Sequence, residues 1–119
     1  MLNVQFDGDV LGVQPDGPIT REDVATLTRA ADDYLAGHPK IAGVMVETRT
    51  FPGFASVGAF ADYAGFIAAH HARVRRVALV TDSALAPVAE FMANHVVGLQ
   101  MRHYPFAEGA AAQAWLRSP

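Results

Sequence analysis

The sequence predicts an α/β fold: a single mixed, mostly parallel sheet of about five strands with helices packed on it. Two short runs of apolar alternation, residues 2–6 and 10–13, flank the turn Asp7-Gly8-Asp9 and predict a hairpin. Beyond the hairpin, apolar runs of strand length alternate with amphipathic runs of helix length, as in parallel sheets with helical crossovers. The expected order is ββαβαβαβα, in a single domain over residues 1–119.

The first helix is predicted to begin after Thr20 and to end at Gly37. Thr20 stands three residues before Asp23, which is typical of a helix N-terminus, and apolar residues then recur at helical spacing. Pro39 supports the end of this helix. The run from Ile41 to Thr48 is apolar on both faces around its centre, which indicates an interior strand covered by helices.

The second half of the chain continues the alternation of helices and strands. A loop rich in Gly, Pro and Phe separates the strand that ends near Thr48 from the next helix, and such loops are common ligand sites in α/β sheets. The remaining predicted elements are a helix over Ser56 to His71, a strand over Arg76 to Thr81, a helix from Ser83, a strand over Leu99 to Tyr104 and a closing helix over Ala107 to Leu116.

Composition excludes several classes of function. The 119 residues carry a formal net charge of −3 and only scattered basic residues apart from Arg73, Arg75 and Arg76, so we expect no nucleic-acid partner. The absence of cysteine removes disulfides and thiolate chemistry and fits a reducing compartment. With no signal peptide and no transmembrane segment in the sequence, we expect a cytoplasmic protein.

Several segments resemble the SpoIIAA-like (STAS/CRAL-TRIO-related) family of small bacterial proteins. They are the Gly17-Pro18-Ile19-Thr20 start of the first helix, the strand from Arg75 to Asp82, and the ending from Met101-Arg102-His103-Tyr104-Pro105-Phe106 to Ala114-Trp115-Leu116. The resemblance covers nearly the whole chain and implies a mixed, mostly parallel sheet. It also implies a non-enzymatic module, used for regulatory protein contacts in anti-sigma-factor antagonists and for apolar ligands in CRAL-TRIO relatives.

Anti-sigma-factor antagonists carry a phosphoacceptor of the type Asp-Ser-Ser-Gly at a helix start, and this chain has Ala55-Ser56-Val57-Gly58 there. Because the Asp and the second hydroxyl are replaced, we interpret Ser56 as a helix N-cap rather than as a phosphoacceptor.

Aromatic and histidine side chains supply the candidate binding residues. On the helix over 56–71, an expected core stripe runs through Val57, Phe60 and Ile67, and a second stripe lies beside it. The next helix repeats this pattern. Its expected core stripe is Leu85, Val88 and Met92, and Phe91 and His95 lie beside it. The second stripes could be a wider core, a dimer seam or the wall of an apolar pocket. The candidates are Phe51, Phe54, Tyr63, Phe66, His70, Phe91 and His95.

Polar residues at the strand ends supply a separate set of candidates. Glu47, Arg49, Asp82 and Ser83 stand where an α/β enzyme places its acid, base or nucleophile. The simpler interpretation is an ion pair between Glu47 and Arg49, with Asp82 and Ser83 as helix caps. Histidine spacing matches no helical zinc site, so we expect neither a metal nor a cofactor.

The sequence therefore favours a non-enzymatic binding module that forms a homodimer or contacts a protein partner. The alternative is a carrier or sensor of an apolar, lipid-like small molecule in a groove between helices. A small enzyme with a strand-end site is the third hypothesis.

Overall fold

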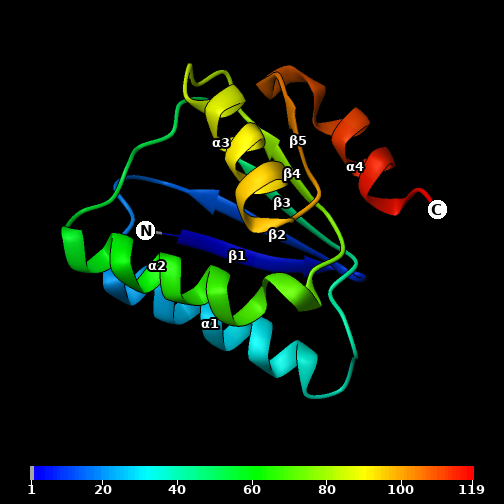
Figure 1. The fold of residues 1–119 in the computed structure, drawn as a ribbon, viewed down its shortest axis with the longest axis horizontal. Helices are drawn as coiled ribbons and strands as arrows, with labels where there is room; N and C mark the ends of the chain where they lie inside the picture. Colours follow the sequence, from blue (N-terminus) through cyan, green and yellow to red (C-terminus); the bar gives the residue numbers. More distant parts are fainter. Residues whose placement is uncertain (1) are drawn as a thin grey trace.

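The computed structural model describes residues 2–119, apart from the side chain of Val96. Its sheet has five strands in the order β1-β2-β3-β4-β5 (Figure 1). Strand β1 (Leu2–Asp7) pairs antiparallel with β2 (Val10–Pro15), and β3 (Gly43–Glu47), β4 (Val77–Val80) and β5 (Met101–Tyr104) follow in parallel. The predicted hairpin and the mixed, mostly parallel sheet are confirmed.

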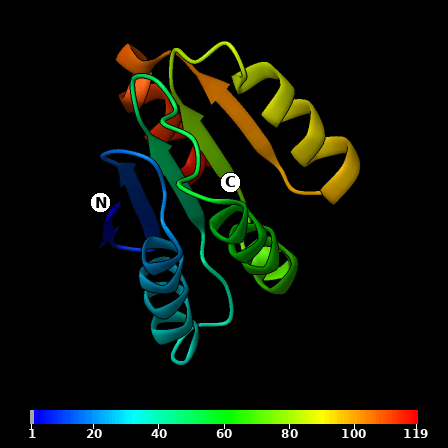
Figure 2. The same cartoon turned by 90° about the vertical axis from the view of Figure 1, so that its left-hand side faces the viewer.

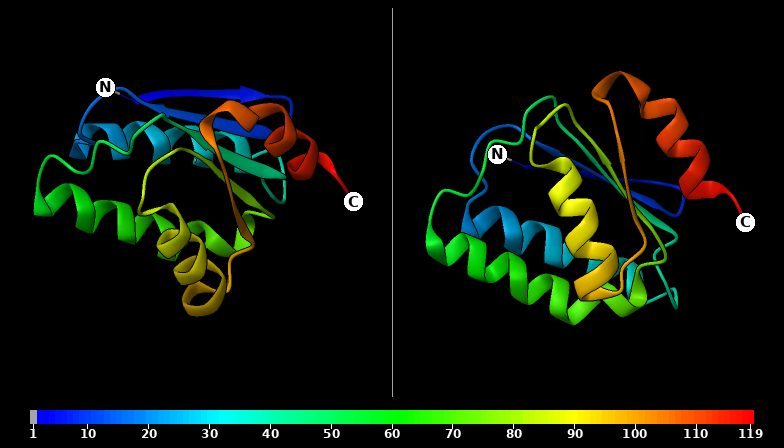
Figure 3. Two further views of the ribbon diagram at one scale, coloured as in Figure 1. Left: turned by 90° about the horizontal axis from the view of Figure 1, so that it is seen from above. Right: turned by 45° about the horizontal axis from the view of Figure 1, so that its top comes forward.

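The helices cover the two faces of the sheet unequally. Helices α1 (Arg21–Leu35), α2 (Val57–His70) and α3 (Ala86–Met92) lie on one face, and α4 (Gly109–Arg117) packs on the other (Figures 2 and 3). No helix of residues 2–119 has the length and apolar character that crossing a membrane requires. Short helical segments complete the chain: η1 (His71–Arg73), η2 (Ala93–Val97) and η3 (Phe106–Glu108).

Alternation along the strands divides the core into two layers. In β3, Val44 and Val46 face the α1 and α2 side, whereas Met45 packs with Ala112 and Leu116 of α4. Successive side chains of a strand point to opposite faces, so one apolar run serves both layers. This accounts for the continuous apolar character of residues 41–46.

The first helix begins with the expected capping box. The Thr20 hydroxyl accepts from the Asp23 amide at 3.0 Å, and the Asp23 carboxylate accepts from the Thr20 amide at 3.0 Å. The same carboxylate accepts from the Leu2 amide at 3.1 Å, which joins the start of β1 to α1. These bonds hold the pKa of Asp23 below its ordinary value, although partial burial acts in the opposite direction.

The expected core stripe of α3 is wrong, and that of α2 is wrong except at Ile67, which is half-buried in the interior. Val57 and Phe60 are 86% and 57% exposed, and the inward side of α2 carries Tyr63, Phe66 and His70 instead. In α3 the large residues Leu85, Val88 and Met92 are exposed, while small alanines face the sheet. Helical spacing groups residues on one face, but with two apolar stripes it does not tell which of them faces inward.

Candidate functional site

An apolar cavity lies between α2 and the face of the sheet that α1 also covers. Its volume is about 90 Å³, several times the roughly 10 to 15 Å³ that one water molecule occupies. The wall includes residues of all five strands, of α1 and α2, and of the loop between β3 and α2. Its side chains are almost all aliphatic or aromatic, and the polar exceptions are Tyr63, His70 and His71. A void of this kind favours an apolar occupant over water.

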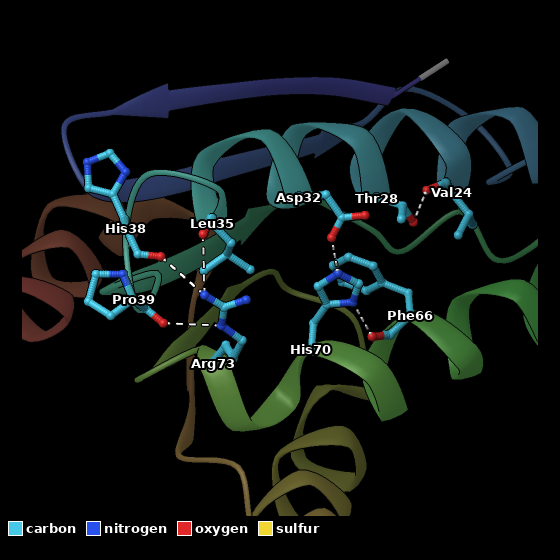
Figure 4. Close-up of polar contacts among 9 residues, drawn as sticks. All are labelled: Val24, Thr28, Asp32, Leu35, His38, Pro39, Phe66, His70 and Arg73. Carbon is cyan, nitrogen blue, oxygen red and sulfur yellow. Dashed lines mark hydrogen bonds and ion pairs between the residues drawn. The ribbon is translucent and has the colours of Figure 1, made fainter.

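Polar contacts fasten α2 to α1. Near the middle of α2, Arg21 Nε lies 2.8 Å from Asp62 Oδ2. At the C-terminal end of α2, His70 Nε2 lies 2.7 Å from Asp32 Oδ1 (Figure 4). Just beyond α2, the Arg73 guanidinium donates to the Leu35 carbonyl at 3.3 Å, so the middle and the C-terminal end of α2 are tied to the α1 side. The large rings on the inward side of α2 then bridge the remaining space to the strands.

Both ring nitrogens of His70 face hydrogen-bond acceptors. Nδ1 lies 2.9 Å from the Phe66 carbonyl oxygen, and Nε2 lies 2.7 Å from the Asp32 carboxylate (Figure 4). The His70 ring also stacks on Phe66 at a centroid distance of 4.4 Å. His70 therefore supplies both a structural tie and part of the cavity wall.

Tyr63 is the other polar group at the centre of α2. Burial raises the pKa of its hydroxyl, which keeps the group neutral. The hydroxyl makes no hydrogen bond with any part of the chain that the structure describes. Its ring packs against Phe54 at a centroid distance of 5.4 Å, on the side of the cavity formed by the loop.

Five of the seven predicted binding residues come together in this cavity. Phe51 and Phe54 approach it from the loop, with ring centroids 5.7 Å apart, and Tyr63, Phe66 and His70 approach it from α2. The gathering of these residues favours the pocket over the dimer seam among the alternatives that the sequence left open. Their role in binding stays a prediction.

The other two candidates lie apart from the cavity. Phe91 is 58% exposed and stacks on His95 at a centroid distance of 4.4 Å, on the outer side of α3 and η2. Val88 and Met92 of the same short helix and Leu85 just before it are also exposed. An apolar surface therefore covers the outside of α3.

The strand-end residues do not form one constellation. The expected ion pair is absent: Glu47 Oε1 accepts from Gln14 Nε2 at 3.0 Å, and Arg49 lies over the Phe106 ring at 4.7 Å. Strand β3 ends at Glu47, so the regular alternation that would place both residues on one side does not continue to Arg49.

The expected capping role of Asp82 is also wrong. Asp82 Oδ1 accepts from the Phe106 amide at 3.0 Å, and α3 begins only at Ala86. The Ser83 hydroxyl accepts from the Leu85 amide at 3.4 Å, so it closes the turn before the helix. Each of these polar groups has a local structural partner.

Ser56 is the N-cap of α2, as expected. Its hydroxyl accepts from the Ala59 amide at 3.1 Å. Within residues 2–119, no group of three His, Asp or Glu side chains is placed to hold a metal ion.

Sequence reasoning missed several aliphatic residues of the cavity wall. Val44, Val77, Leu99 and Met101 line it and were expected only as strand positions, and Ile19 also lines it although it was expected only at the start of the first helix. A signal was present in the β3 alternation, since residues 44 and 46 share the face of the aromatic helix. The positions of Leu99 and Met101 depend on how η2 turns back into β5, which the sequence does not specify.

Comparisons with known proteins address the fold. A family model described as SpoIIAA-like matches residues 10–117. No curated protein matches the sequence significantly. A solved structure similar to this chain is that of an uncharacterized DUF3478-family protein with a SpoIIAA-like fold from Shewanella loihica PV-4. The TM-score is 0.79 over 98% of this chain and 92% of that chain, at 22% sequence identity.

Proposed function

The chain belongs to the SpoIIAA-like family, and from that premise we propose that it binds an apolar small molecule in the cavity beneath α2. The observation that carries this proposal is the apolar wall, to which the loop and α2 contribute four aromatic rings, Phe51, Phe54, Tyr63 and Phe66. Protein interiors are close-packed, and a void of this size leaves its lining atoms without partners on one side. An apolar ligand restores those contacts.

The size of the cavity limits the ligand. Its volume of about 90 Å³ is smaller than the engineered cavity of about 150 Å³ that accepts benzene. A narrow aliphatic chain therefore fits better than a ring system. The enclosed part of the ligand is short, and a longer molecule would have to extend out of the cavity.

We propose binding without catalysis. The two ring nitrogens of His70 already lie within hydrogen-bond distance of Asp32 and of the Phe66 carbonyl oxygen. An acid, base or nucleophile must be free to reach the reacting atom. His70 is instead engaged in holding α2 against α1.

A titration with n-pentane followed by ¹H–¹⁵N NMR tests this function. We expect the amide shifts of α2 and β3 to change in a saturable manner in the wild type. Ile67→Phe places a ring at a half-buried cavity position and should abolish those changes. Val57→Phe adds the same ring to the same helix at an exposed position outside the cavity and should leave them intact. Absence of saturable shifts in the wild type, or equal behaviour of the two variants, would contradict the proposal.

The exposed surface of α3 favours a second candidate function, self-association. Leu85, Val88 and Phe91 are each more than half exposed, and exposed apolar clusters of this kind mark interaction sites. We expect a dimer in analytical ultracentrifugation that Phe91→Asp converts to monomer. Phe60→Asp, at an equally exposed ring on α2, should leave the dimer intact. A monomeric wild type, or a dimer unaffected by Phe91→Asp, would reject this candidate.

A further inference from the structure

The polar side chains of the cavity wall differ in whether they have hydrogen-bond partners within the protein. His70 uses both ring nitrogens, and His71 uses Nδ1 in its contact with the Ile67 carbonyl oxygen. The Tyr63 hydroxyl lies in the cavity wall and makes no hydrogen bond with the described residues.

A hydrogen-bond donor that has no protein partner in an apolar wall favours a ligand that carries a hydrogen-bond acceptor. Burial raises the pKa of the Tyr63 hydroxyl, so its proton is present throughout the neutral pH range. A wholly hydrocarbon ligand would displace any water from this group and leave its donor unsatisfied, which weakens binding. A ligand oxygen near Tyr63 would replace that water.

The charges around the cavity indicate that the acceptor is neutral. Among the described residues, no Lys or Arg lines the cavity. The His70 ring is two helical turns away from Tyr63, about 10 Å along the axis, and its Nε2 faces the Asp32 carboxylate. A carboxylate near Tyr63 would lose its hydration without gaining a cation, which is strongly unfavourable.

Resting on the proposed function, we propose that the ligand is a narrow aliphatic molecule with one uncharged oxygen acceptor, which Tyr63 binds by donating its hydroxyl hydrogen. Ketones, aldehydes, esters and alcohols share this chemistry. The chain of such a ligand would lie along α2 from Tyr63 toward Ile67, about 6 Å along the helix axis. The aromatic side chains Phe54 and Phe66 would contact it on either side of Tyr63.

A pair of probes with the same shape tests this assignment. 2-Pentanone and 2-methylpentane have equal numbers of non-hydrogen atoms and differ in the replacement of a methyl group by oxygen. Dissociation constants from ¹H–¹⁵N NMR titrations are compared for the wild type and Tyr63→Phe, which loses only the hydroxyl. We expect 2-pentanone to bind the variant about threefold to tenfold more weakly, with 2-methylpentane unchanged or slightly tighter. Pentanoate should bind neither protein.

The controls separate this inference from the function on which it rests. Tyr34→Phe removes a hydroxyl from a ring stacked between Phe6 and His38, outside the cavity, and should leave both affinities unchanged. Saturable binding of both probes with no selective loss in Tyr63→Phe would overturn the role of Tyr63 and leave the proposed function standing. Binding of pentanoate as tight as that of 2-pentanone would overturn the uncharged acceptor. Failure of both neutral probes to shift the cavity amides would overturn the proposed function and this inference together.

Discussion

Replacement of His70 by leucine tests whether the contact between His70 and Asp32 holds α2 against α1. The imidazole side chain is only 11% exposed, and its Nε2 lies 2.7 Å from Asp32 Oδ1. Leucine retains an apolar contact with Phe66 but donates no hydrogen bond. The substitution therefore removes the link to α1 while it keeps most of the buried apolar surface.

The expected loss in the free energy of unfolding depends on how exposed the side chains of His70 and Asp32 are. A hydrogen bond to a charged group, here the Asp32 carboxylate, contributes about 1.5 to 3 kcal/mol, whereas an exposed ion pair contributes about 0.2 to 1 kcal/mol. The Asp32 side chain is 60% exposed, so water can replace the lost donor there. The His70 side is nearly dry, and its second bond, to the Phe66 carbonyl, is lost as well. We expect His70→Leu to lower the free energy of unfolding by about 1 to 2 kcal/mol.

Urea denaturation of His70→Leu, Asp32→Asn and the double variant measures the coupling between the two side chains. We expect a coupling energy of about 1 kcal/mol. Asp33→Asn is the matched control, because Asp33 is an exposed neighbour on the same helix. Its coupling to His70 should be close to zero. A coupling to Asp32 no larger than the coupling to Asp33 would refute the tie between α1 and α2.

Three further predictions concern stability away from the cavity. Gly43→Ala should lower the free energy of unfolding by about 1 to 3 kcal/mol in urea denaturation, because the new Cβ would lie 2.9 Å from Cδ2 of the fully buried Leu116. Gly65→Ala should raise it by about 0.5 to 1 kcal/mol in the same assay, since a Cβ there meets no atom within 4 Å. The depressed pKa of Asp23 stabilises the fold above the ordinary carboxyl pKa of about 4, and this contribution is lost as the pH falls through the folded-state pKa. Asp23→Asn should therefore flatten the acid limb of a plot of stability against pH, and an unchanged limb would contradict this assignment.

The architecture could be predicted from local sequence patterns because each element carries its own signal. Thr20 and Asp23 mark the start of α1, and Ser56 marks the start of α2. The apolar alternation that ends at Asp7 and resumes at Val10 specifies the hairpin. Such signals act within a few residues, so a single sequence is sufficient to locate them.

The candidate site could be predicted only in part, because its geometry depends on contacts between distant elements. The sequence indicated Phe51, Phe54, Tyr63 and Phe66 as surplus aromatic residues, and the structure places them around one cavity. It could not indicate that His70 would meet Asp32, since these residues are 38 positions apart. Nor could it predict that Asp82 would bind the Phe106 amide, because that contact requires β5 to lie beside β4.

The opposite arrangements of alanine in α2 and α3 explain why one helix covers a cavity and the other exposes an apolar surface. In α3, Ala86 is buried, as is Ala93 just beyond its end, so small side chains face the sheet and the helix can approach it closely. The large residues of α3 are left outside. In α2 only Ala59, near the start of the helix, is a buried alanine; farther along, Ala64 and Ala68 are exposed and the rings of Tyr63 and Phe66 face the strands. A helix that rests on large rings stands farther from the sheet, and those rings do not fill the intervening space completely. A small molecule is therefore expected beneath α2, and a protein partner is expected on the outside of α3.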